Sequence, residues 1–511
     1  MYGNELKKEF GDYQTPEYFA ENICSYLYNN LNIRPQYIIE PTAGIGNFIK
    51  ASLKIFKQCQ NIVGIELNEQ YCKKIDTSIQ DERVHTICDN FFDHNLFPFR
   101  VNGDETLIIG NPPWVMNSNL KFNMPLKSNF KKLKGLDAIT GSGNFDICEY
   151  IILKLIDSFK NTNAVIAMLC KTSVARNIFH ELNMTSEKVE YIKIINFNAS
   201  KIFKVGVSAC LLVVKLSNIM RNCSICEVSD IDERQKKADY IYFKNGKICS
   251  DNSCKDLDGK CKFEWRQGVK HDCAKIMELE KISDHEYQNK NEEIIRLEND
   301  IVFPLIKSSD FKRPIINCNF KKFVIVTQKS IREDTAYIEL LAPNTWKYLN
   351  DNKEMFDRRK SSIYKGAPSF SMFGVGHYSY SKYKVGVSGF YKTPLFSLLY
   401  NAEWVEHPVM LDDTSYFLSF DGYNDAYVCM LLLNCELVQN FLCSISFKDS
   451  KRPFTKKILQ RLDFEKCFHY VTFQYFIETE KKLNLPPYIT EKMYDTFKAR
   501  ASENHFDFQT F

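Results

Sequence analysis

The sequence has no apolar run that approaches the roughly 20 residues a membrane-spanning helix needs. Its first residues, MYGNELKKEF, have no apolar stretch of the kind that marks a signal peptide. Internal repeats and low-complexity tracts are also absent, which excludes a repeat architecture. We therefore expect a cytoplasmic protein without a membrane segment.

Cysteine is abundant, with 18 residues, but it is not accompanied by a secretion signal. This combination indicates reduced thiols rather than a disulfide framework. A net charge of +4 is too small to indicate a nucleic-acid partner by itself, so such an interpretation must rest on local clusters. The 511 residues, with 44% hydrophobic content, predict a globular chain of about two or three domains.

Strand and helix patterns alternate over residues 1–220, which we expect to form one domain. The helix expected at 14–31 has Thr15 as its N-cap and Phe19, Ile23, Leu27 and Leu31 on one face. Apolar strands are expected at 37–40, 61–68, 84–91, 106–110, 164–172, 191–197 and 207–216. Strands separated by helices form a mostly parallel sheet, whose ligands bind at the strands' carboxyl ends.

Two further segments follow this α/β pattern. Residues 221–264 are charged and rich in cysteine, and we expect a linker or excursion there. Residues 265–511 have shorter segments and more aromatic and basic residues, which indicates a second domain.

The first expected strand ends in EPTAGIGNF, residues 40–48. Gly44 and Gly46 allow a tight turn and a close approach to a ligand, next to the N–H groups of a helix. The turn is not a G-x-G-x-x-G dinucleotide fingerprint, because Phe48 and Ile49 follow. Taken alone, it is equally compatible with an ordinary turn between a strand and a helix.

Acidic residues end the next two expected strands. Glu66 is placed to accept both hydroxyls of a ribose, and Asp89 to accept the amino group of an adenine. Each acid alone is compatible with a helix cap or a solvated side chain. Together with the glycine turn, they indicate a cofactor that contains an adenosine.

The fourth expected strand runs into Asn111, Pro112, Pro113 and Trp114. The prolines are stiff and cannot donate backbone hydrogen bonds, so they hold an acceptor-rich turn. The Asn111 side-chain oxygen and the Pro112 carbonyl could accept both N–H groups of an aromatic amine and make it more nucleophilic. Trp114 offers a face on which a base can stack. The alternative is a turn at a strand end with a Trp packed in the core.

Together these motifs resemble the S-adenosylmethionine-dependent DNA amino-methyltransferases, specifically the N6-adenine type of restriction–modification systems. The resemblance covers about residues 9–215, from FGDYQTPEYFA through the glycine turn to NPPW, which is the gamma order of motifs. The segment NSNLKF…CEYII after the turn adds to it. The chain departs from the family in having Glu40-Pro-Thr instead of Asp-Pro-Ala, which keeps the carboxylate. Cytosine-N4 enzymes more often have Ser in place of the Asn.

The resemblance implies an α/β, Rossmann-like class I methyltransferase domain followed by a mixed α+β target-recognition domain. It implies S-adenosyl-L-methionine as cofactor, bound by Thr15, Pro16, Glu40, Thr42, Ala43, Gly44, Gly46, Phe48, Glu66, Leu67, Asp89, Asn90 and Asn111. It assigns catalysis to Asn111, Pro112, Pro113 and Trp114, with Phe203 as a second aromatic for the other face of the flipped base. An apolar anchor is the alternative for Phe203.

Basic and aromatic residues interleave in 356–392, with seven Lys or Arg and the single acid Asp357. A second cluster is KDSKRPFTKK, and a third, KSNFKKLKG, lies near the catalytic turn. Such side chains neutralise phosphates or reach base edges, although a solvated sheet edge is the alternative. The expected DNA contacts are Arg358, Arg359, Lys360, Lys365, Tyr378, Lys382, Lys384, Lys451 and Arg452.

Cysteines 223, 226, 249, 254 and 261 are imperfectly spaced for a zinc ribbon, so we favour plain thiols and expect no metal site. His271-Asp272-Cys273 resembles a catalytic triad only in composition, and we interpret it as structural.

The expected substrate is double-stranded DNA, and the resemblance allows a cognate restriction endonuclease as partner. A monomer is sufficient, since one recognition domain follows one catalytic domain. Alternatives are a methyltransferase acting on RNA or on a protein glutamine amide, and a catalytically silent DNA-specificity module.

Overall fold

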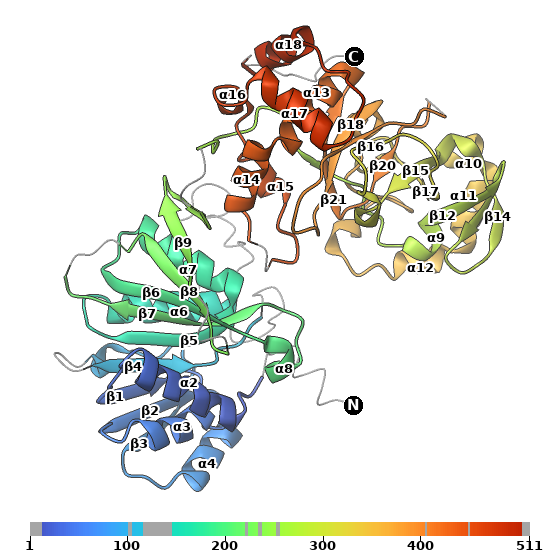
Figure 1. Cartoon of the computed structure of the whole chain (residues 1–511). Coiled ribbons are helices and arrows are strands. Elements are labelled where there is room, and N and C mark those ends of the chain that lie inside the picture. Colours follow the sequence, from blue (N-terminus) through green and yellow to red (C-terminus); the bar gives the residue numbers. More distant parts are fainter. Residues whose placement is uncertain are drawn as a thin grey trace. The chain divides into compact units, whose positions relative to one another are not determined.

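The computed structural model describes residues 13–100, 105–115, 146–219, 223–232, 238–251, 256–403, 406–447 and 450–502. The chain divides into two units, Met1–Asn252 and Ser253–Phe511 (Figure 1). The basic segment 127–135 and the rest of 116–145 lie outside the described residues.

One ten-stranded sheet organises the first unit, in the order β10-β9-β8-β6-β7-β5-β4-β1-β2-β3. Strands β1 to β5 are parallel, and β7 lies antiparallel between β5 and β6. The strands are β1 (Tyr37–Glu40), β2 (Asn61–Glu66), β3 (Val84–Cys88), β4 (Thr106–Gly110), β5 (Val165–Lys171), β6 (Val189–Phe197), β7 (Ala209–Leu216), β8 (Ile225–Asp230), β9 (Asp239–Lys244) and β10 (Lys247–Cys249). The predicted α/β, Rossmann-like class is confirmed.

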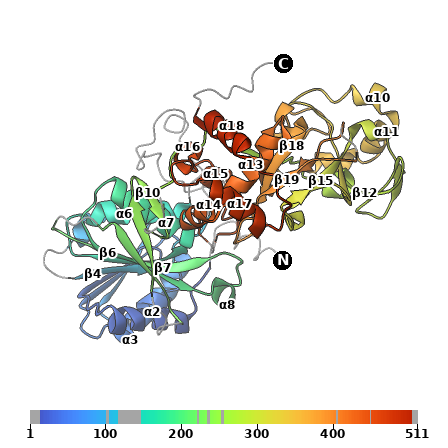
Figure 2. The same ribbon diagram turned by 45° about the horizontal axis from the view of Figure 1, so that its top comes forward.

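Helices cover both faces of this sheet, with α2 and α3 on one side and α6 and α7 on the other (Figure 2). The helices are α2 (Glu17–Asn30), α3 (Asn47–Ile55), α4 (Glu69–Ser78), α6 (Ile147–Phe159), α7 (Thr172–Met184) and α8 (Ala199–Phe203), with a 3-10 turn η1 (Phe97–Phe99). Because the parallel strands all end at one edge, their carboxyl ends lie side by side there.

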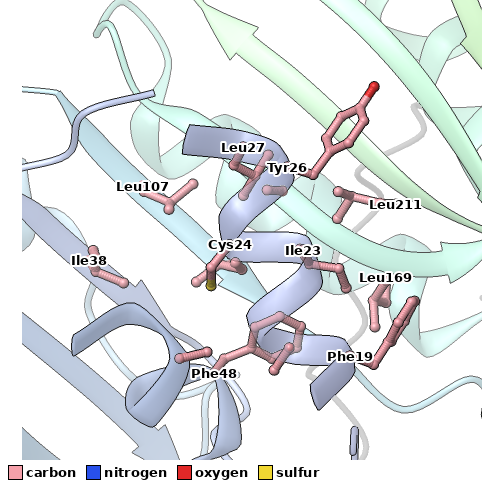
Figure 3. Packing of buried hydrophobic residues seen from close by; sticks show 14 of the residues in the cluster. Phe19, Ile23, Cys24, Tyr26, Leu27, Ile38, Phe48, Leu107, Leu169 and Leu211 are labelled. Carbon is pink, nitrogen blue, oxygen red and sulfur yellow. The ribbon is translucent and has the colours of Figure 1, made fainter. Parts of the chain in front are cut away.

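Helix α2 packs its apolar face against the sheet (Figure 3). Phe19, Ile23 and Leu27 are almost fully buried, as the helical spacing predicts. Its N-terminus differs from the prediction: Pro16, not Thr15, occupies the N-cap position, with no side-chain cap bond. The Pro16 carbonyl instead accepts the N–H groups of Phe19 and Ala20.

The segment expected to be a linker or excursion, 221–264, contributes three strands to the first sheet. Strand β8 pairs in parallel with β6, and β9 and β10 extend the sheet by antiparallel pairing. Its charged side chains suit these strands because β9 and β10 are mostly exposed or half-buried. The first unit therefore extends beyond residue 220, and the boundary falls at Asn252.

The second unit has two sheets, with strand orders β11-β21-β18-β19-β16 and β14-β13-β12-β17-β15-β20. Its strands are β11 (Arg266–Gln267), β12 (Glu278–Ser283), β13 (Glu286–Asn289), β14 (Ile294–Arg296), β15 (Val302–Ile306), β16 (Ile315–Ile316), β17 (Lys322–Ile325), β18 (Tyr383–Ser388), β19 (Ser397–Leu399), β20 (Met410–Leu411) and β21 (Ser415–Phe420). The predicted mixed α+β class is confirmed.

Helices pack against both sheets of this unit. The helices are α9 (Ala274–Met277), α10 (Ile338–Leu341), α11 (Pro343–Asp351), α12 (Lys353–Asp357), α13 (Tyr423–Asn434), α14 (Glu436–Ser444), α15 (Lys456–Leu459), α16 (Phe464–Cys467), α17 (Phe473–Lys482) and α18 (Glu491–Ser502), with 3-10 turns η3 (Asn299–Ile301), η4 (Ser308–Asp310), η5 (Ser362–Tyr364) and η6 (His377–Tyr380). Helix α13 packs against β18, β19 and β21, and α9 packs against β12 and β13. Within the described ranges, no single helix has the length and apolar composition to cross a membrane, and only the bent pair α13 and α14 meets both measures when taken together.

Candidate active site

The glycine turn between β1 and α3 is held by its neighbours. Gly44 and Gly46 have φ angles of 54° and 81°, in the left-handed region that favours glycine. The Gly44 N–H donates to Glu66 Oε2 at 2.7 Å, and the other oxygen, Oε1, accepts the N–H of Asn68 at 2.8 Å. Glu66, at the end of β2, thus fixes the turn after β1 and also the start of α4, which the Asn68 side chain caps.

The residues before α2 are fastened to the same turn. Gln14 Oε1 accepts the N–H of Ile45 at 3.1 Å, and Asn47 Nδ2 donates to the Thr15 carbonyl at 2.7 Å. The structure therefore brings the predicted N-terminal cofactor segment onto the glycine turn.

Three polar side chains in this region have buried oxygens without a hydrogen-bond partner: Thr15 Oγ1, Thr42 Oγ1 and Glu40 Oε2. Glu40 is only 3% exposed. Burial, and then the negative charge of Glu66, raise the pKa of the Glu40 carboxyl well above its usual range. Unpartnered buried polar groups are costly, so this set fits a cofactor with an ammonium and a sulfonium group, as S-adenosylmethionine has.

Asp89 directly follows β3 and is partly engaged within its own turn. Its carboxylate pairs with His94 Nδ1 at 2.8 Å and accepts the N–H of Asn90 at 2.7 Å. The hydrogen bond with His94, followed by that from Asn90, lowers the pKa of Asp89. Each carboxylate oxygen has more than one acceptor site, so an adenine amino group remains a possible donor to it. The Asn90 side chain accepts from Phe92 N–H and donates to Asp93, so it builds the turn.

The turn predicted to be catalytic, Asn111 to Trp114, follows β4, whose residues are all buried. Asn111 Nδ2 donates to the Tyr13 carbonyl at 2.8 Å, whereas Asn111 Oδ1 is buried and has no partner. The amide is therefore held by its donor end with its acceptor end unused. Trp114 Nε1 donates to the Leu169 carbonyl at 3.2 Å, which fixes the indole beside β5.

Phe203, which the resemblance assigns to the other face of the flipped base, contacts Trp114 directly, with ring centroids 5.4 Å apart and an interplanar angle of 72°. This edge-to-face contact leaves no gap for a base between the two rings. Phe203 is 8% exposed and also contacts Phe19 and Phe197, so it belongs to the core cluster as well.

One partly buried ion pair beside the Asn111–Trp114 turn is not predicted from the sequence. Lys171 Nζ, at the end of β5, lies 2.6 Å from Asp146 Oδ2, and Asp146 caps α6. Burial raises the pKa of Asp146 although Lys171 opposes that shift. The Ile147 N–H donates to the Val115 carbonyl, so α6 anchors the chain just after Trp114. Two sequence features could have indicated this ion pair: an Asp directly before the helix pattern and a Lys at the end of the strand pattern.

The predicted DNA contacts in the second unit divide by exposure. Lys360, Lys365, Lys382, Lys451 and Arg358 are exposed, and Tyr378 and Arg452 are half-buried.

Arg359 does not have a free guanidinium. It donates to the carbonyls of Phe356, His271 and Ser371, and lies 3.7 Å from the Tyr364 ring centroid. The structure corrects its assignment from DNA contact to a role within the fold.

Lys384 is 1% exposed, and its ammonium donates to the Ser381 carbonyl at 2.7 Å. It cannot reach a phosphate from this position, because β18 is buried on both faces. This corrects the second DNA assignment. Burial lowers the pKa of Lys384 from 10.5 to about 7.

The buried Lys384 predicts a pH-dependent stability. Because the unfolded chain binds this proton up to its ordinary pKa, the free energy of unfolding should rise from about pH 7 to pH 10.5. Lys384→Met should remove this rise and stabilise the fold at pH 7 by about 1–4 kcal/mol. Urea unfolding of both proteins across this range measures the difference, and equal pH dependence would contradict the assignment.

No described group of three or more His, Cys, Asp or Glu side chains is arranged to hold a metal ion. The thiols of Cys223, Cys226 and Cys249 donate to backbone carbonyls, and Cys254 lies outside the described residues. In the predicted structural triad, His271 accepts the Cys273 N–H, so it supports a local turn.

Comparison with known proteins gives one curated relative over most of the chain. The sequence is 40% identical to the type II methyltransferase M.NspV of Nostoc sp. (strain ATCC 29411 / PCC 7524) over 474 residues, covering 90% of this chain and 97% of that protein. No family model matches the sequence.

Solved structures give looser matches. A type I restriction-modification system methyltransferase subunit from Streptococcus thermophilus is 13% identical, with a TM-score of 0.33 over 47% of this chain and 51% of that chain. The ATP-dependent type ISP restriction-modification enzyme LlaBIII bound to DNA is 12% identical, with a TM-score of 0.43 over 96% of this chain and 39% of that chain. This chain therefore spans about half of the first structure and less of the second.

Proposed function

This chain belongs to the type II methyltransferases of restriction–modification systems, which methylate DNA with S-adenosylmethionine, and we propose that it modifies the N6 amino group of adenine. In this proposal it acts as a monomer on double-stranded DNA in the cytoplasm and protects sites that a cognate endonuclease cuts.

The observation that carries the proposal is the state of Asn111 at the end of β4. Its Nδ2 is occupied by the Tyr13 carbonyl, so the amide cannot rotate without losing that bond, and its buried Oδ1 remains available as an acceptor. A buried acceptor of this kind fits a ligand that donates a hydrogen bond. The exocyclic amino group of adenine is such a donor.

Asn111 Oδ1 and the Pro112 carbonyl would each accept one N–H of that amino group. These two bonds draw the nitrogen lone pair out of conjugation with the ring, so that it can attack. When bound, S-adenosylmethionine supplies a methyl group activated by its sulfonium. The chain forms no covalent intermediate, and its contribution is positioning and electrostatic stabilisation.

Trp114 would hold the flipped base by stacking, worth about 1–3 kcal/mol. Its indole is already fixed by the bond to Leu169. Phe203 would cover the other face of the base only after the two rings, now in edge contact, have separated. Pro113 keeps the turn between Asn111 and Trp114 stiff.

The cofactor would lie along the carboxyl ends of β1, β2 and β3. The glycine turn and the segment before α2 would bind its methionine part, Glu66 its ribose and Asp89 its adenine. The proposed cofactor residues are Thr15, Pro16, Glu40, Thr42, Ala43, Gly44, Gly46, Phe48, Glu66, Leu67, Asp89, Asn90 and Asn111.

The substrate class is tested by methyl transfer from tritiated S-adenosylmethionine to duplex DNA, RNA and a glutamine-containing peptide in parallel. The proposal expects incorporation into duplex DNA alone. Incorporation into RNA or peptide would support the corresponding alternative substrate. Cofactor binding without any incorporation would indicate a silent specificity module.

The exposed lysines of the second unit predict a salt-dependent DNA affinity. Replacing Lys360 and Lys365 by alanine should weaken binding alike across sequences and reduce the slope of log affinity against log salt by about 2. Fluorescence anisotropy over a salt series measures this slope. Lys347→Ala with Lys481→Ala, two exposed lysines on helices, is the matched control. If the two double variants have equal slopes, Lys360 and Lys365 do not contact DNA phosphates.

A further inference from the structure

A cavity of about 510 Å³ lies within the second unit, and most of its lining comes from connections between the two sheets. Its walls come from the residues after β11, from η4, from the residues after β18 and from the turn between β20 and β21. This volume is in the range of small-molecule sites. None of the residues assigned to the first unit's catalytic site lines it.

Asp412 lines this cavity with one carboxylate oxygen unused. The residue is 6% exposed, and Oδ1 accepts three hydrogen bonds, from Thr414 N–H, Thr414 Oγ1 and Ser415 Oγ. Oδ2 accepts none from the described residues. Gly268 allows the chain to pack tightly here, since a Cβ would lie 2.1 Å from the Asp412 carbonyl oxygen. The position of Asp412 is therefore held firmly while Oδ2 stays available as an acceptor.

Hydrogen-bond donors lie on another wall of the cavity. Lys307 Nζ contacts both oxygens of Glu278 at 2.8 Å, and Lys290 pairs with the same carboxylate. His271 is 7% exposed, and its Nδ1 accepts the Cys273 N–H, so the neutral ring carries its proton on Nε2. Nε2 lies 3.7 Å from Glu278 Oε1, which is longer than a hydrogen bond. Burial lowers the pKa of His271 to about 4, which keeps the ring neutral.

An aromatic side chain, Phe390, completes the lining. The Arg452 guanidinium lies 5.1 Å from its ring centroid and Lys451 Nζ lies 6.0 Å away. Arg452 also donates to the carbonyl of Asp413, another lining residue. Two of the basic residues that the sequence marks for DNA therefore lie beside this cavity.

The lining favours a flat ligand that both donates and accepts hydrogen bonds. Four carboxylates against two lysines disfavour a phosphate: Asp272, Glu278, Asp412 and Asp413 against Lys270 and Lys307. An aromatic face, an open carboxylate oxygen and a neutral imidazole N–H suit a base with an amino group beside a ring nitrogen. Adenine has this pattern in the major groove, at N6 and N7, and adenine and cytosine both have it on the edge that an unpaired base exposes.

We infer that the cavity receives an adenine or cytosine base of the bound DNA, with Asp412 Oδ2 accepting its amino group and Phe390 packing on its ring. This base is part of the recognition sequence and is distinct from the base that is methylated. The inference rests on the proposed function only in taking DNA as the ligand.

The test is selection of bound duplexes from a random pool, followed by sequencing, with the full chain and S-adenosylhomocysteine. Asp412→Asn keeps an oxygen for Thr414 and Ser415 but turns the open acceptor into a donor. It should reduce preference at one A·T or G·C position on the order of ten- to a hundredfold. Glu480→Gln is the matched control, because that buried carboxylate also accepts three hydrogen bonds on one oxygen, outside the cavity.

An unchanged sequence preference in Asp412→Asn and in Phe390→Leu would overturn the inference. The base in the cavity could belong to bound DNA or to a free nucleotide. Ligand-observed NMR with AMP and CMP measures whether free nucleotides bind. If Asp412→Asn abolishes nucleotide binding but leaves the sequence preference for duplexes unchanged, the cavity binds free nucleotides, and DNA is not the source of the base. Because selection reads binding and not methylation, it decides the inference even if methyl transfer to adenine is not found.

Discussion

Asn111→Ala is expected to lower kcat for methyl transfer by about 10²–10³-fold while S-adenosylmethionine still binds, with its affinity lowered by no more than about tenfold through the loss of one contact. The reason is the geometry of this amide: Nδ2 is anchored on the Tyr13 carbonyl, and the buried Oδ1 is the acceptor that would activate the amine. The variant removes that acceptor but leaves Glu40, Glu66 and the glycine turn in place. Single-turnover methylation and calorimetric titration of the cofactor measure the two quantities.

Asn183→Ala is the matched control. Asn183 Nδ2 also donates to a backbone carbonyl, that of Phe179, and its Oδ1 is also buried without a partner. It lies in α7, away from the carboxyl ends of the parallel strands. If both variants lose activity to the same degree, the effect is on the fold and the proposed role of Asn111 is wrong.

Glu66→Ala is expected to weaken cofactor affinity by about tenfold to a hundredfold. Its carboxylate accepts the backbone N–H groups of Gly44 and Asn68, and in the proposal it also binds the ribose. The variant frees the glycine turn from β2 and removes a charge-assisted acceptor. A calorimetric titration with S-adenosylmethionine measures the change.

Glu298→Ala controls for the loss of a carboxylate that accepts backbone N–H groups. Glu298 binds the N–H groups of Asn344 and Thr345 in the second unit. Its replacement should leave cofactor affinity unchanged. Cofactor affinity in Glu66→Ala equal to that of the wild type would refute the assignment of the ribose site.

Strands β1, β2 and β4 could be predicted because each combines a short buried run with a distinctive end. The residues of β3 are exposed or half-buried, but this strand also has a distinctive end. Gly44, Glu66, Asp89 and Asn111 follow or end β1 to β4, and a parallel sheet brings such ends together. The antiparallel position of β7 was not predicted, since its apolar run is compatible with either direction.

The predictions failed where the burial of a residue depends on contacts with residues far away along the chain. Lys384 stands among basic residues that suggest DNA, yet it lies in a strand covered on both faces. Arg359 satisfies carbonyls from segments far along the chain, including that of His271. The charged segment 221–264 gave no apolar alternation, but β8 finds a partner in β6.

Nucleoside mass spectrometry of duplex DNA incubated with the protein and S-adenosylmethionine tests the central claim most directly. The account predicts N6-methyladenine, at a level that Asn111→Ala abolishes and Asn183→Ala retains. N4-methylcytosine would contradict the assignment of the base, and duplex DNA without any methylated base would contradict the proposed activity.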